Sequence, residues 1–373
     1  MKIGIDFHAA EQAGSGNCTY IRNLVESLLA TDRDNEYFLY IMDPAFPYYR
    51  QFADRRNVHL RPIGAKEALR RIPRLGLKTR LDRVDLLHVQ YVAPPFYRGK
   101  LVVSIHDLSF VGNPNFFSWG KRTYLRILVP FSLKKASQVI AISDFSRQAI
   151  ISTYHIPAER VHLTYLAARS GFRPEKNPDE QRSLIRKLGL RDQFLLFVGR
   201  LDVRKNILAL IRAFTYLKKT KGIPHQLVIT GKKDFLPVPL LKEIFADDIA
   251  QHIILTGFVP DELLPTLYSL AEVFVYPSLY EGFGLPVLEA MASGCPVIAS
   301  NTTSLPEIVE EAGLLVNPRL WEGLAEAIWK VISDDTLRAD LKRKSLAQSQ
   351  KFRWAETAQK TMSVYKKAIQ EPL

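Results

Sequence analysis

The 373-residue sequence has few cysteines and no long apolar run, and each shortage excludes a class of protein. Its 2 cysteines, Cys18 and Cys295, are far apart, which fits neither a disulfide framework nor a zinc site and predicts a reducing compartment. No apolar stretch approaches the ~18 residues that span a bilayer. The N-terminus lacks the apolar core of a signal peptide. We therefore expect a cytoplasmic protein that can contact a membrane without crossing it.

Acidic residues are fewer than basic ones, and the excess of positive charge is uneven. The chain has 51 Lys and Arg against 38 Asp and Glu, a net charge of +13. Residues 1–170 hold 24 basic and 14 acidic residues, a balance of +10, which leaves 27 and 24 for the remainder, a balance of +3. The first half therefore faces an anionic partner or uses the charge for solubility alone. Nucleic acid, anionic lipid headgroups and phosphorylated lipids are the candidate partners.

Apolar runs typical of buried strands alternate with helical patterns in both halves of the chain. The length suits two domains of ordinary size. Such alternation predicts an α/β protein with two doubly wound domains that face each other across a cleft. We place the first domain at 1–170, a proline-containing and highly charged linker at 171–190, and the second domain at 191–351.

The central motif lies in the second half, at 280–294, with the sequence YEGFGLPVLEAMASG. An apolar strand, Val273–Tyr276, leads into the loop 281–284, and a short helix carrying Glu289 follows. This order of strand, glycine loop and helix places backbone amides and a helix N-terminus at the carboxyl end of a parallel strand, where anions bind. Glu281 and Glu289 would hold the hydroxyls of a phosphorylated ligand. The alternative is a solvated Glu281 and a Glu289 that interacts only with the helix dipole.

Two cations and a histidine follow other predicted strands. Arg200 and Lys205 come after the strand at 193–198, at the same sheet edge as the central motif. Together they can neutralise a diphosphate and stabilise it as a leaving group. His106 follows the strand 101–105, where it faces the predicted cleft. Exposed surface cations and a structural histidine are the alternatives.

A glycine-containing turn near the N-terminus marks a weaker anion site. Gly14 and Gly16 precede a helix predicted from about Thr19 to Leu29. Thr19 stands where a dinucleotide fingerprint would have its third glycine, so that motif is not met.

The first half also contains a candidate membrane-contacting surface. Residues 61–83 are rich in Arg and Lys with apolar residues between them, as in a helix that lies on a membrane, although a solvated helix face gives the same pattern. Aromatic residues in this half add to the surface: Phe46, Tyr48, Tyr49, Phe116, Phe117 and Trp119.

Together these motifs resemble the retaining glycosyltransferases of family 4, which have the GT-B fold. The resemblance rests on VGRLDVRKN at 198–206 and YEGFGLPVLEAMASGCPVIAS at 280–300, with support from IHDLS at 105–109 and from 256–278 and 304–318. It covers nearly the whole chain. It implies that the last helix, 352–373, packs back on the first domain, which would bind the acceptor.

The resemblance also implies roles for individual residues. Arg200 and Lys205 would hold the donor diphosphate, Glu281 the transferred sugar and Glu289 the ribose hydroxyls. His106 would lie near the reacting carbon. The amides of Leu285 and Val287 would contact phosphate or sugar, and the base would lie near Gly231, Phe258 and Val259. Gly16 would approach the diphosphate, whereas Cys18 stands where the family often has a second glycine and leaves the role of Gly14 open.

The expected reaction retains the anomeric configuration and uses no metal or other cofactor, because no paired-aspartate motif is present and Arg and Lys supply the charge. The acceptor hydroxyl would attack on the face that the diphosphate leaves. A covalent intermediate on Glu281 is the rival route. GDP-mannose is the favoured donor, because IHDLS and the proline and aromatic cluster after it resemble polysaccharide-assembly mannosyltransferases. UDP-glucose, UDP-N-acetylglucosamine and UDP-galactose are the alternatives.

The expected acceptor is a saccharide or a lipid-linked saccharide at the inner leaflet of the plasma membrane. Two other classes stay open. A sugar-nucleotide epimerase or a phosphorylase would use the same scaffold, the latter with a lysine-bound pyridoxal phosphate. A basic nucleic-acid-binding protein is disfavoured, because no nucleic-acid motif is present.

Overall fold

A computed structural model describes residues 1–12, 14–64, 67–231 and 248–371. The described residues form two compact units, Met1–Leu166 with Arg353–Leu373, and Ala167–Phe352. The segment that the sequence assigned to a linker, 171–190, is part of the second unit. It contains helix α6 (Pro178–Leu188), which packs on helix α9 (Leu264–Leu270) and buries Leu184 in the core.

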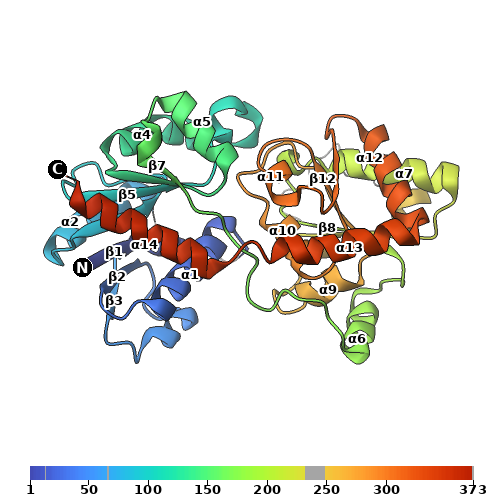
Figure 1. Cartoon of the computed structure of the whole chain (residues 1–373), viewed down its shortest axis with the longest axis horizontal. Helices are drawn as coiled ribbons and strands as arrows, with labels where there is room; N and C mark the ends of the chain where they lie inside the picture. Colours follow the sequence, from blue (N-terminus) through green and yellow to red (C-terminus); the bar gives the residue numbers. More distant parts are fainter. Residues whose placement is uncertain (13, 65–66, 232–247, 372–373) are drawn as a thin grey trace. The chain divides into compact units, whose positions relative to one another are not determined.

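The described part of the first unit is built on a seven-stranded parallel sheet with strand order β3-β2-β1-β4-β5-β6-β7 (Figure 1). Strands such as β4 and β6 are fully buried, as expected where helices cover both faces of a parallel sheet. The strands are β1 (Lys2–Asp6), β2 (Glu36–Ile41), β3 (Val58–Pro62), β4 (Leu86–Gln90), β5 (Lys100–Ile105), β6 (Gln138–Ala141) and β7 (Val161–Leu163).

Helices cover both faces of this sheet. Helix α14, the C-terminal helix, runs beside α1 and contacts β4, β5 and β6 (Figure 1), so the last helix of the chain completes the first unit. The other face is covered by α2, α4 and α5, which contribute Ile72, Val129 and Ile150 to the core. The helices are α1 (Gly16–Thr31), α2 (Ala68–Leu81), α3 (Ser109–Gly112), α4 (Trp119–Lys135), α5 (Asp144–Tyr154) and α14 (Trp354–Gln370).

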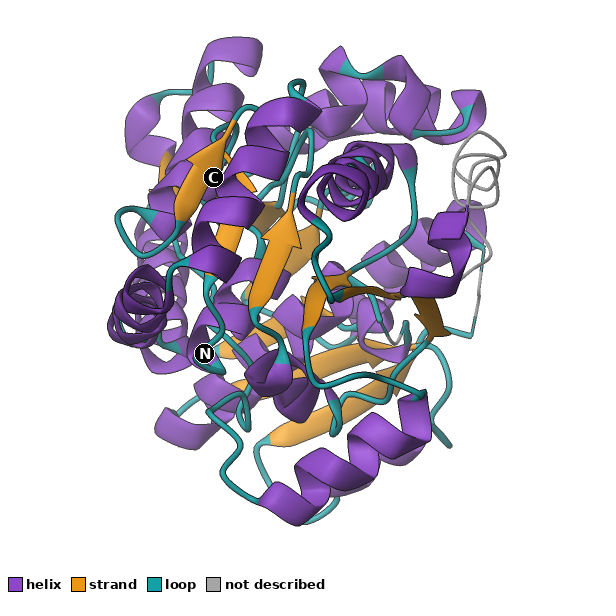
Figure 2. Cartoon of the chain, turned by 90° about the vertical axis from the view of Figure 1, so that its right-hand side faces the viewer, coloured by secondary structure: helices purple, strands orange, loops and turns teal. Residues whose placement is uncertain are grey.

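The second unit repeats the plan with a six-stranded parallel sheet among its described residues, in the order β10-β9-β8-β11-β12-β13. Figure 2 shows its strands packed between helices. The strands are β8 (Phe194–Val198), β9 (Gln226–Thr230), β10 (Ile253–Gly257), β11 (Val273–Tyr276), β12 (Val297–Ser300) and β13 (Leu314–Val316). The remaining helices are α7 (Ile207–Lys221), α10 (Leu285–Ala292), α11 (Leu305–Val309), α12 (Trp321–Ser333) and α13 (Asp335–Ser349).

The strand order of each sheet contains one reversal, and ligands of open α/β sheets bind at the carboxyl ends of the strands beside such a point. The reversal lies between β1 and β4 in the first unit and between β8 and β11 in the second. In the second unit, the loops after β8 and β11 carry Lys205 and Glu281. The fold therefore brings the two loops that the sequence singled out to adjacent strand ends.

Candidate active site

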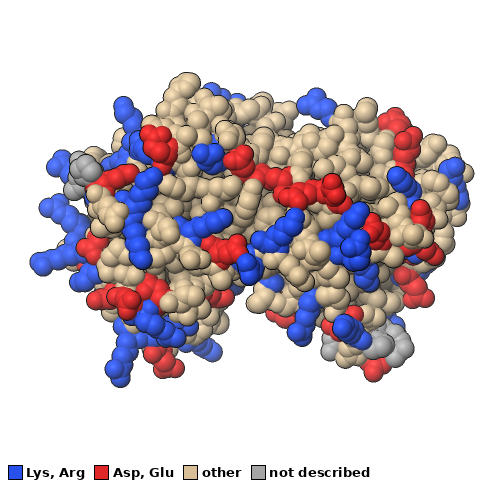
Figure 3. Space-filling model, in the orientation of Figure 1, with Lys and Arg blue, Asp and Glu red and all other residues tan. Residues whose placement is uncertain are grey.

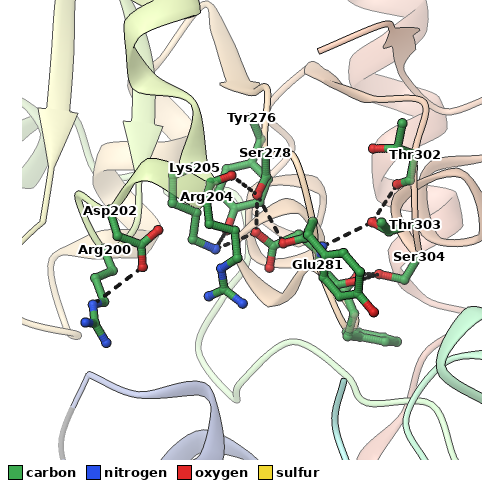
Figure 4. Close-up of polar contacts among 12 residues, drawn as sticks. Arg200, Asp202, Arg204, Lys205, Tyr276, Ser278, Glu281, Thr302, Thr303 and Ser304 are labelled. Carbon is green, nitrogen blue, oxygen red and sulfur yellow. Dashed lines mark hydrogen bonds and ion pairs between the residues drawn. The ribbon is translucent and has the colours of Figure 1, made fainter. Parts of the chain in front are cut away.

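The centre of the candidate site is a buried ion pair between the loops after β8 and β11 (Figure 4). Lys205 Nζ lies 2.5 Å from Glu281 Oε1 and donates a hydrogen bond to the Tyr276 hydroxyl oxygen at 2.6 Å. Ser278 Oγ donates to the same Glu281 oxygen at 2.5 Å. Both charged side chains are about 6% exposed. These short contacts hold both side chains in fixed positions. Removing either one would leave an uncompensated buried charge.

The surroundings keep the Glu281 side chain ionised. Burial on its own would raise the pKa of Glu281, but the charges of Lys205 and Arg204 and the hydrogen bonds from Lys205 and Ser278 outweigh it and hold the pKa below its usual range. The group at this position is therefore an acceptor of hydrogen bonds at neutral pH, suited to a sugar hydroxyl.

Two arginines lie in the same loop as Lys205. Arg200 is 55% exposed and its Nε lies 3.6 Å from Asp202 Oδ2, so its guanidinium reaches solvent at the carboxyl edge of the sheet. Arg204, which the sequence analysis did not select, lies beside the buried pair and contributes to the low pKa of Glu281 (Figure 4). Its position directly before Lys205 and four residues after Arg200 is the signal that could have indicated it.

The glycine loop after β11 is held by a second loop that sequence reasoning missed. Thr303 Oγ1 accepts from the Glu281 amide at 3.1 Å, and Ser304 Oγ lies 3.0 Å from the carbonyl oxygens of Glu281 and Phe283 (Figure 4). Thr303 has a φ of +59°, unusual for a β-branched residue. Strain of this kind is found where the surroundings fix a functional loop.

The helix that follows the glycine loop begins as the motif predicts. Gly284 has a φ of +108°, and a Cβ on it would lie 2.6 Å from Leu305 Cδ2, so glycine is required there. Helix α10 begins at Leu285 with Pro286 in its first turn. The Val287 amide already donates to the Gly284 carbonyl at 2.9 Å. A ligand would have to share that amide, which weakens the role predicted for Val287 relative to Leu285.

The segments expected near the base also meet at the sheet edge. A Cβ on Gly231 would lie 2.0 Å from the Gly199 carbonyl oxygen, so the ends of β8 and β9 approach too closely for any side chain there. Phe258 is exposed, whereas Val259 is buried in the core. Of these two, only Phe258 offers its side chain to a ligand.

Glu289 has a partner that the sequence analysis did not predict. The Arg169 Nε donates to Glu289 Oε1 at 2.7 Å, and Arg169 Nη1 lies 2.5 Å from Asp261 Oδ2. Burial raises the pKa of Glu289, and the charge of Arg169 opposes this rise. Arg169 lies just before the segment that the sequence assigned to a linker, and in the structure it belongs to the second unit.

In the first unit, His106 lies at the carboxyl end of β5, as predicted. It is buried, its ring centroid is 4.7 Å from that of Tyr20, and its Nε2 has no hydrogen-bond partner within the described residues. Burial lowers the pKa of His106 to about 4, with Asp107 opposing, so the ring is neutral at physiological pH. Its predicted place near the reacting carbon stays a prediction.

Helix α1 begins three residues earlier than the sequence predicted. Ser15 caps it by accepting a hydrogen bond from the Cys18 amide at 3.2 Å, so the helix starts at Gly16 instead of about Thr19. Gly16 therefore lies at the helix N-terminus, and a Cβ on it would meet no atom within 4 Å. Gly14 has a φ of +79°, which explains a glycine there by turn geometry.

The switch point of the first sheet carries polar side chains that the sequence analysis missed. Asp6 ends β1 and is buried, with its Oδ1 2.7 Å from His8 Nδ1. Gln90 ends β4 and is also buried, and neither polar atom of its side chain has a partner in the described part of the chain. A separate hollow of about 430 Å³, lined by residues such as Lys2 and Glu36, lies at the opposite edge of this sheet.

The aromatic residues proposed for membrane contact differ in exposure, and Phe116 and Phe117 are intermediate. Tyr49 is buried and packs against Phe7, Phe46 and Tyr48, so these rings belong to the interior and its margin. Trp119, by contrast, is 82% exposed. Basic side chains project from the part of the first unit that contains α2 (Figure 3).

The described residues also bear on two other classes of site. They contain no group of three or more His, Cys, Asp or Glu side chains placed to hold a metal ion. In the same residues, no helix combines the length and apolar character needed to span a bilayer.

The chain is similar in sequence to known transferases. Residues 180–348 match the model described as Glycosyl transferases group 1, and residues 16–167 match Glycosyltransferase Family 4. O-antigen chain mannosyltransferase B of Escherichia coli is 35% identical over 281 residues, which cover 74% of each chain. A serotype-specific mannosyltransferase of Escherichia coli is 33% identical over 73% of this chain, which is only 34% of that protein's length.

Solved structures share the fold at lower identity. Sucrose-phosphate synthase from Thermosynechococcus elongatus superposes with a TM-score of 0.78 at 23% identity, covering 98% of both chains. An Anabaena protein solved with UDP and glucose gives 0.75 at 21% identity, covering 98% of this chain and 99% of that one. The two Rossmann-like units and these likenesses define a glycosyltransferase of the GT-B fold. More narrowly, the chain belongs to glycosyltransferase family 4.

Proposed function

We propose that this enzyme is a retaining mannosyltransferase that moves mannose from GDP-mannose to a saccharide or lipid-linked saccharide without a metal ion. The observation that carries the proposal is the buried Lys205–Glu281 pair at the switch point of the second sheet, with Arg200 and Arg204 in the same loop. The choice of mannose is supported by relatives that are named as O-antigen mannosyltransferases.

The arrangement suits the departure of a nucleoside diphosphate. Arg200 and Lys205 would hold the diphosphate, and fixed cations stabilise the charge that develops as the bond to the sugar breaks. This positive charge would take the role that a metal ion has in other transferases. The acceptor hydroxyl would attack the oxocarbenium-like carbon from the face that the diphosphate leaves and pass its proton to a phosphate oxygen.

Glu281 is better suited to holding the sugar than to attacking it. Its Oε1 lies 2.5 Å from both Lys205 Nζ and Ser278 Oγ, and these contacts withdraw charge from the oxygen and restrict its movement. Attack on the anomeric carbon would have to come from Oε2, on a carboxylate whose charge and movement the contacts to Oε1 already reduce. The direct same-face route therefore has more support than a covalent intermediate.

A panel of nucleotide-sugars tests the proposal. The melting temperature of the full chain is measured with GDP-mannose, UDP-glucose, UDP-N-acetylglucosamine and UDP-galactose, each with and without EDTA. A ligand that binds the folded state alone raises the melting temperature. We expect the largest rise with GDP-mannose. A larger rise with a UDP-sugar would show that this sugar, and not GDP-mannose, is the donor. A rise that EDTA abolishes would contradict metal independence.

We further propose that the first unit contacts an anionic membrane surface. Leu81 on α2 is 72% exposed and Trp119 at the start of α4 is 82% exposed, and both helices also carry Lys and Arg. Apolar residues among cations are typical of interfacial segments. In vesicle sedimentation at low salt, the protein should pellet with phosphatidylglycerol-containing vesicles and not with phosphatidylcholine alone.

A charge-reversal pair separates surface binding from general charge effects. Arg74→Glu with Lys78→Glu on α2 should abolish sedimentation with anionic vesicles. Lys330→Glu with Lys344→Glu in the second unit changes the net charge equally and should leave sedimentation intact. If both pairs behave alike, or if the wild type does not pellet, the membrane proposal fails.

A further inference from the structure

Arg169 makes a three-part contact within the second unit that the roles assigned so far do not explain. Its Nε donates to Glu289 Oε1 at 2.7 Å, and its Nη1 lies 2.5 Å from Asp261 Oδ2. Its guanidinium carbon also lies over the Phe172 ring, 4.8 Å from the centroid. Two carboxylates and one ring face thus contact a single guanidinium, whose side chain is only 20% exposed.

These contacts fix the guanidinium in one orientation. Phe172, beneath it, packs on Tyr268, with ring centroids 5.9 Å apart, and Tyr268 is fully buried. The planar fork of an arginine binds carboxylates with defined geometry, so an anchored Arg169 also defines the position of each carboxylate. Glu289, itself 5% exposed, is therefore oriented from outside its own helix.

The two carboxylates belong to the segments expected to hold a nucleoside. Glu289 is on α10, directly after the glycine loop, and is proposed to bind ribose hydroxyls. Asp261 follows Phe258, the exposed residue proposed to lie near the base. Arg169 therefore joins the ribose segment to the base segment through one side chain.

We propose that Arg169 is a positioning residue that orients Glu289 for the ribose diol and thereby sets the enzyme's selectivity for ribonucleotides over 2′-deoxyribonucleotides. This inference rests on the proposed nucleotide-sugar function. A carboxylate has about four lone-pair sites, so the contact with Arg169 leaves acceptor positions for two hydroxyls. Because the guanidinium is always charged, Glu289 faces a cation on one side and presents its remaining acceptors on the other.

Nucleotide discrimination tests this role more directly than activity does. Titration calorimetry on the full chain gives the affinities for GDP and 2′-deoxy-GDP, and for UDP and 2′-deoxy-UDP. For the base that binds, the wild type should prefer the ribonucleotide by about tenfold, the value of one hydrogen bond to a charged group. Arg169→Ala should reduce that preference to less than about threefold. A ratio of affinities does not depend on the fraction of active protein.

Further variants separate positioning from a purely structural pair. Glu289→Ala should lose the preference, and Arg169→Ala combined with Glu289→Ala should lose no more, since both act on the same hydroxyls. Arg169→Lys removes the planar fork, and Asp261→Asn removes the charge of one of its partners. Both should give intermediate preferences, and they replace Arg169→Ala in the test if that variant does not fold. Arg343→Ala, which breaks a surface pair with Asp340, is the matched control and should keep the full preference.

The outcomes distinguish this inference from the proposed function. If the folded wild type binds neither ribonucleotide, the proposed function itself fails. If the wild type discriminates, Glu289→Ala does not and Arg169→Ala still does, the function stands and the role of Arg169 is overturned. Lower stability of Arg169→Ala with an unchanged preference for the ribonucleotide also overturns the role of Arg169. The contact with Glu289 would then serve the fold alone.

Discussion

At the scale of single residues, the candidate site depends on charges that are buried and mutually satisfied. Lys205 and Glu281 are each about 6% exposed and are held by Tyr276 and Ser278 as well as by each other. Desolvating two charges costs several kcal/mol, which close geometry and added hydrogen bonds offset. Such a pair is weak evidence for stability and is better explained by the need for charge in a fixed place.

Replacing Glu281 by glutamine should separate the two mechanisms proposed for it. Glu281→Gln leaves Lys205 buried without its countercharge, so we expect stability to fall by about 3 kcal/mol. If Glu281 holds the sugar, folded Glu281→Gln enzyme keeps measurable transfer from the donor. Complete loss of transfer with unchanged donor affinity would favour the covalent route instead. Glu310→Gln, at an exposed pair with Lys351, is the control and should change neither quantity.

Two glycines should respond differently to alanine because their surroundings differ. Gly284→Ala places a Cβ 2.6 Å from Leu305 at a φ of +108°, and we expect a loss of about 1–3 kcal/mol in stability. Gly16→Ala meets no atom within 4 Å, so stability should be unchanged or slightly higher. For Gly16→Ala, kcat/KM should therefore fall while the free energy of unfolding, measured with denaturant, does not. Full activity of Gly16→Ala would remove Gly16 from the donor site.

At the scale of secondary-structure elements, one loop supports another. The loop after β12 places Thr303 and Ser304 against the backbone of the glycine loop, which has few side chains of its own to hold it. The position of Glu281 therefore depends on hydroxyls more than 20 residues away in sequence. Removing the hydroxyl of Thr303 or Ser304 should therefore alter donor binding, although neither residue is proposed to contact the donor.

Removing the Ser304 hydroxyl tests this support. Ser304→Ala removes the hydroxyl that contacts the Glu281 and Phe283 carbonyl oxygens, and we expect a loss of about 1–3 kcal/mol in stability together with a higher KM for the donor. Ser345→Ala removes an equally buried hydroxyl that donates to the Ala312 carbonyl at 3.0 Å, away from the site. It should lose similar stability with an unchanged KM. An unchanged KM in both variants would show that Ser304 supports only the fold.

The sequence predicted strands best where both faces of the strand are buried. Strand β11 matches its predicted bounds, because buried parallel strands are apolar throughout. Strands β3 and β13 have half-exposed residues and were missed for that reason. The start of α1 was misplaced because the cap is Ser15, ahead of the apolar pattern.

The site was predictable where a motif is local and was missed where partners are distant. Glu281 and Lys205 each lie next to glycine or basic residues that mark a loop. Arg169 could not be predicted, because it lies 120 residues from Glu289 in sequence and no local pattern links them. The same holds for Thr303 and Ser304, whose role depends on how two strand ends meet.

At the scale of the whole molecule, acid should act on the first unit through histidines in its core. The first unit contains two fully or largely buried histidines, His88 and His106, near the middle of its sheet. Burial lowers the pKa of His88 to about 3 and that of His106 to about 4. His88 is hydrogen-bonded at both ring nitrogens, to Tyr365 and Ser104, as a neutral ring.

These histidines should make the first unit sensitive to mild acid. In the unfolded chain both rings titrate near 6.5, so below that pH the unfolded state binds more protons and the free energy of unfolding falls as pH falls. We expect a loss of about 2 kcal/mol per histidine between pH 7 and pH 5. Urea unfolding of wild type and His88→Gln at both pH values measures it. An equal loss in both proteins would contradict a role of His88 in acid sensitivity. The control is His59→Gln, at a partly exposed site, which should lose as much stability as the wild type.

The central claim is that the second unit holds a nucleotide-sugar by its diphosphate. The most direct measurement is the affinity of GDP-mannose for the wild type and for Arg200→Ala by titration calorimetry with EDTA present. Arg200 is 55% exposed, so its removal should leave the melting temperature unchanged. The account predicts binding by the wild type and an affinity at least about tenfold lower for Arg200→Ala. Equal affinities, or a folded wild type that binds no nucleotide-sugar, would contradict it.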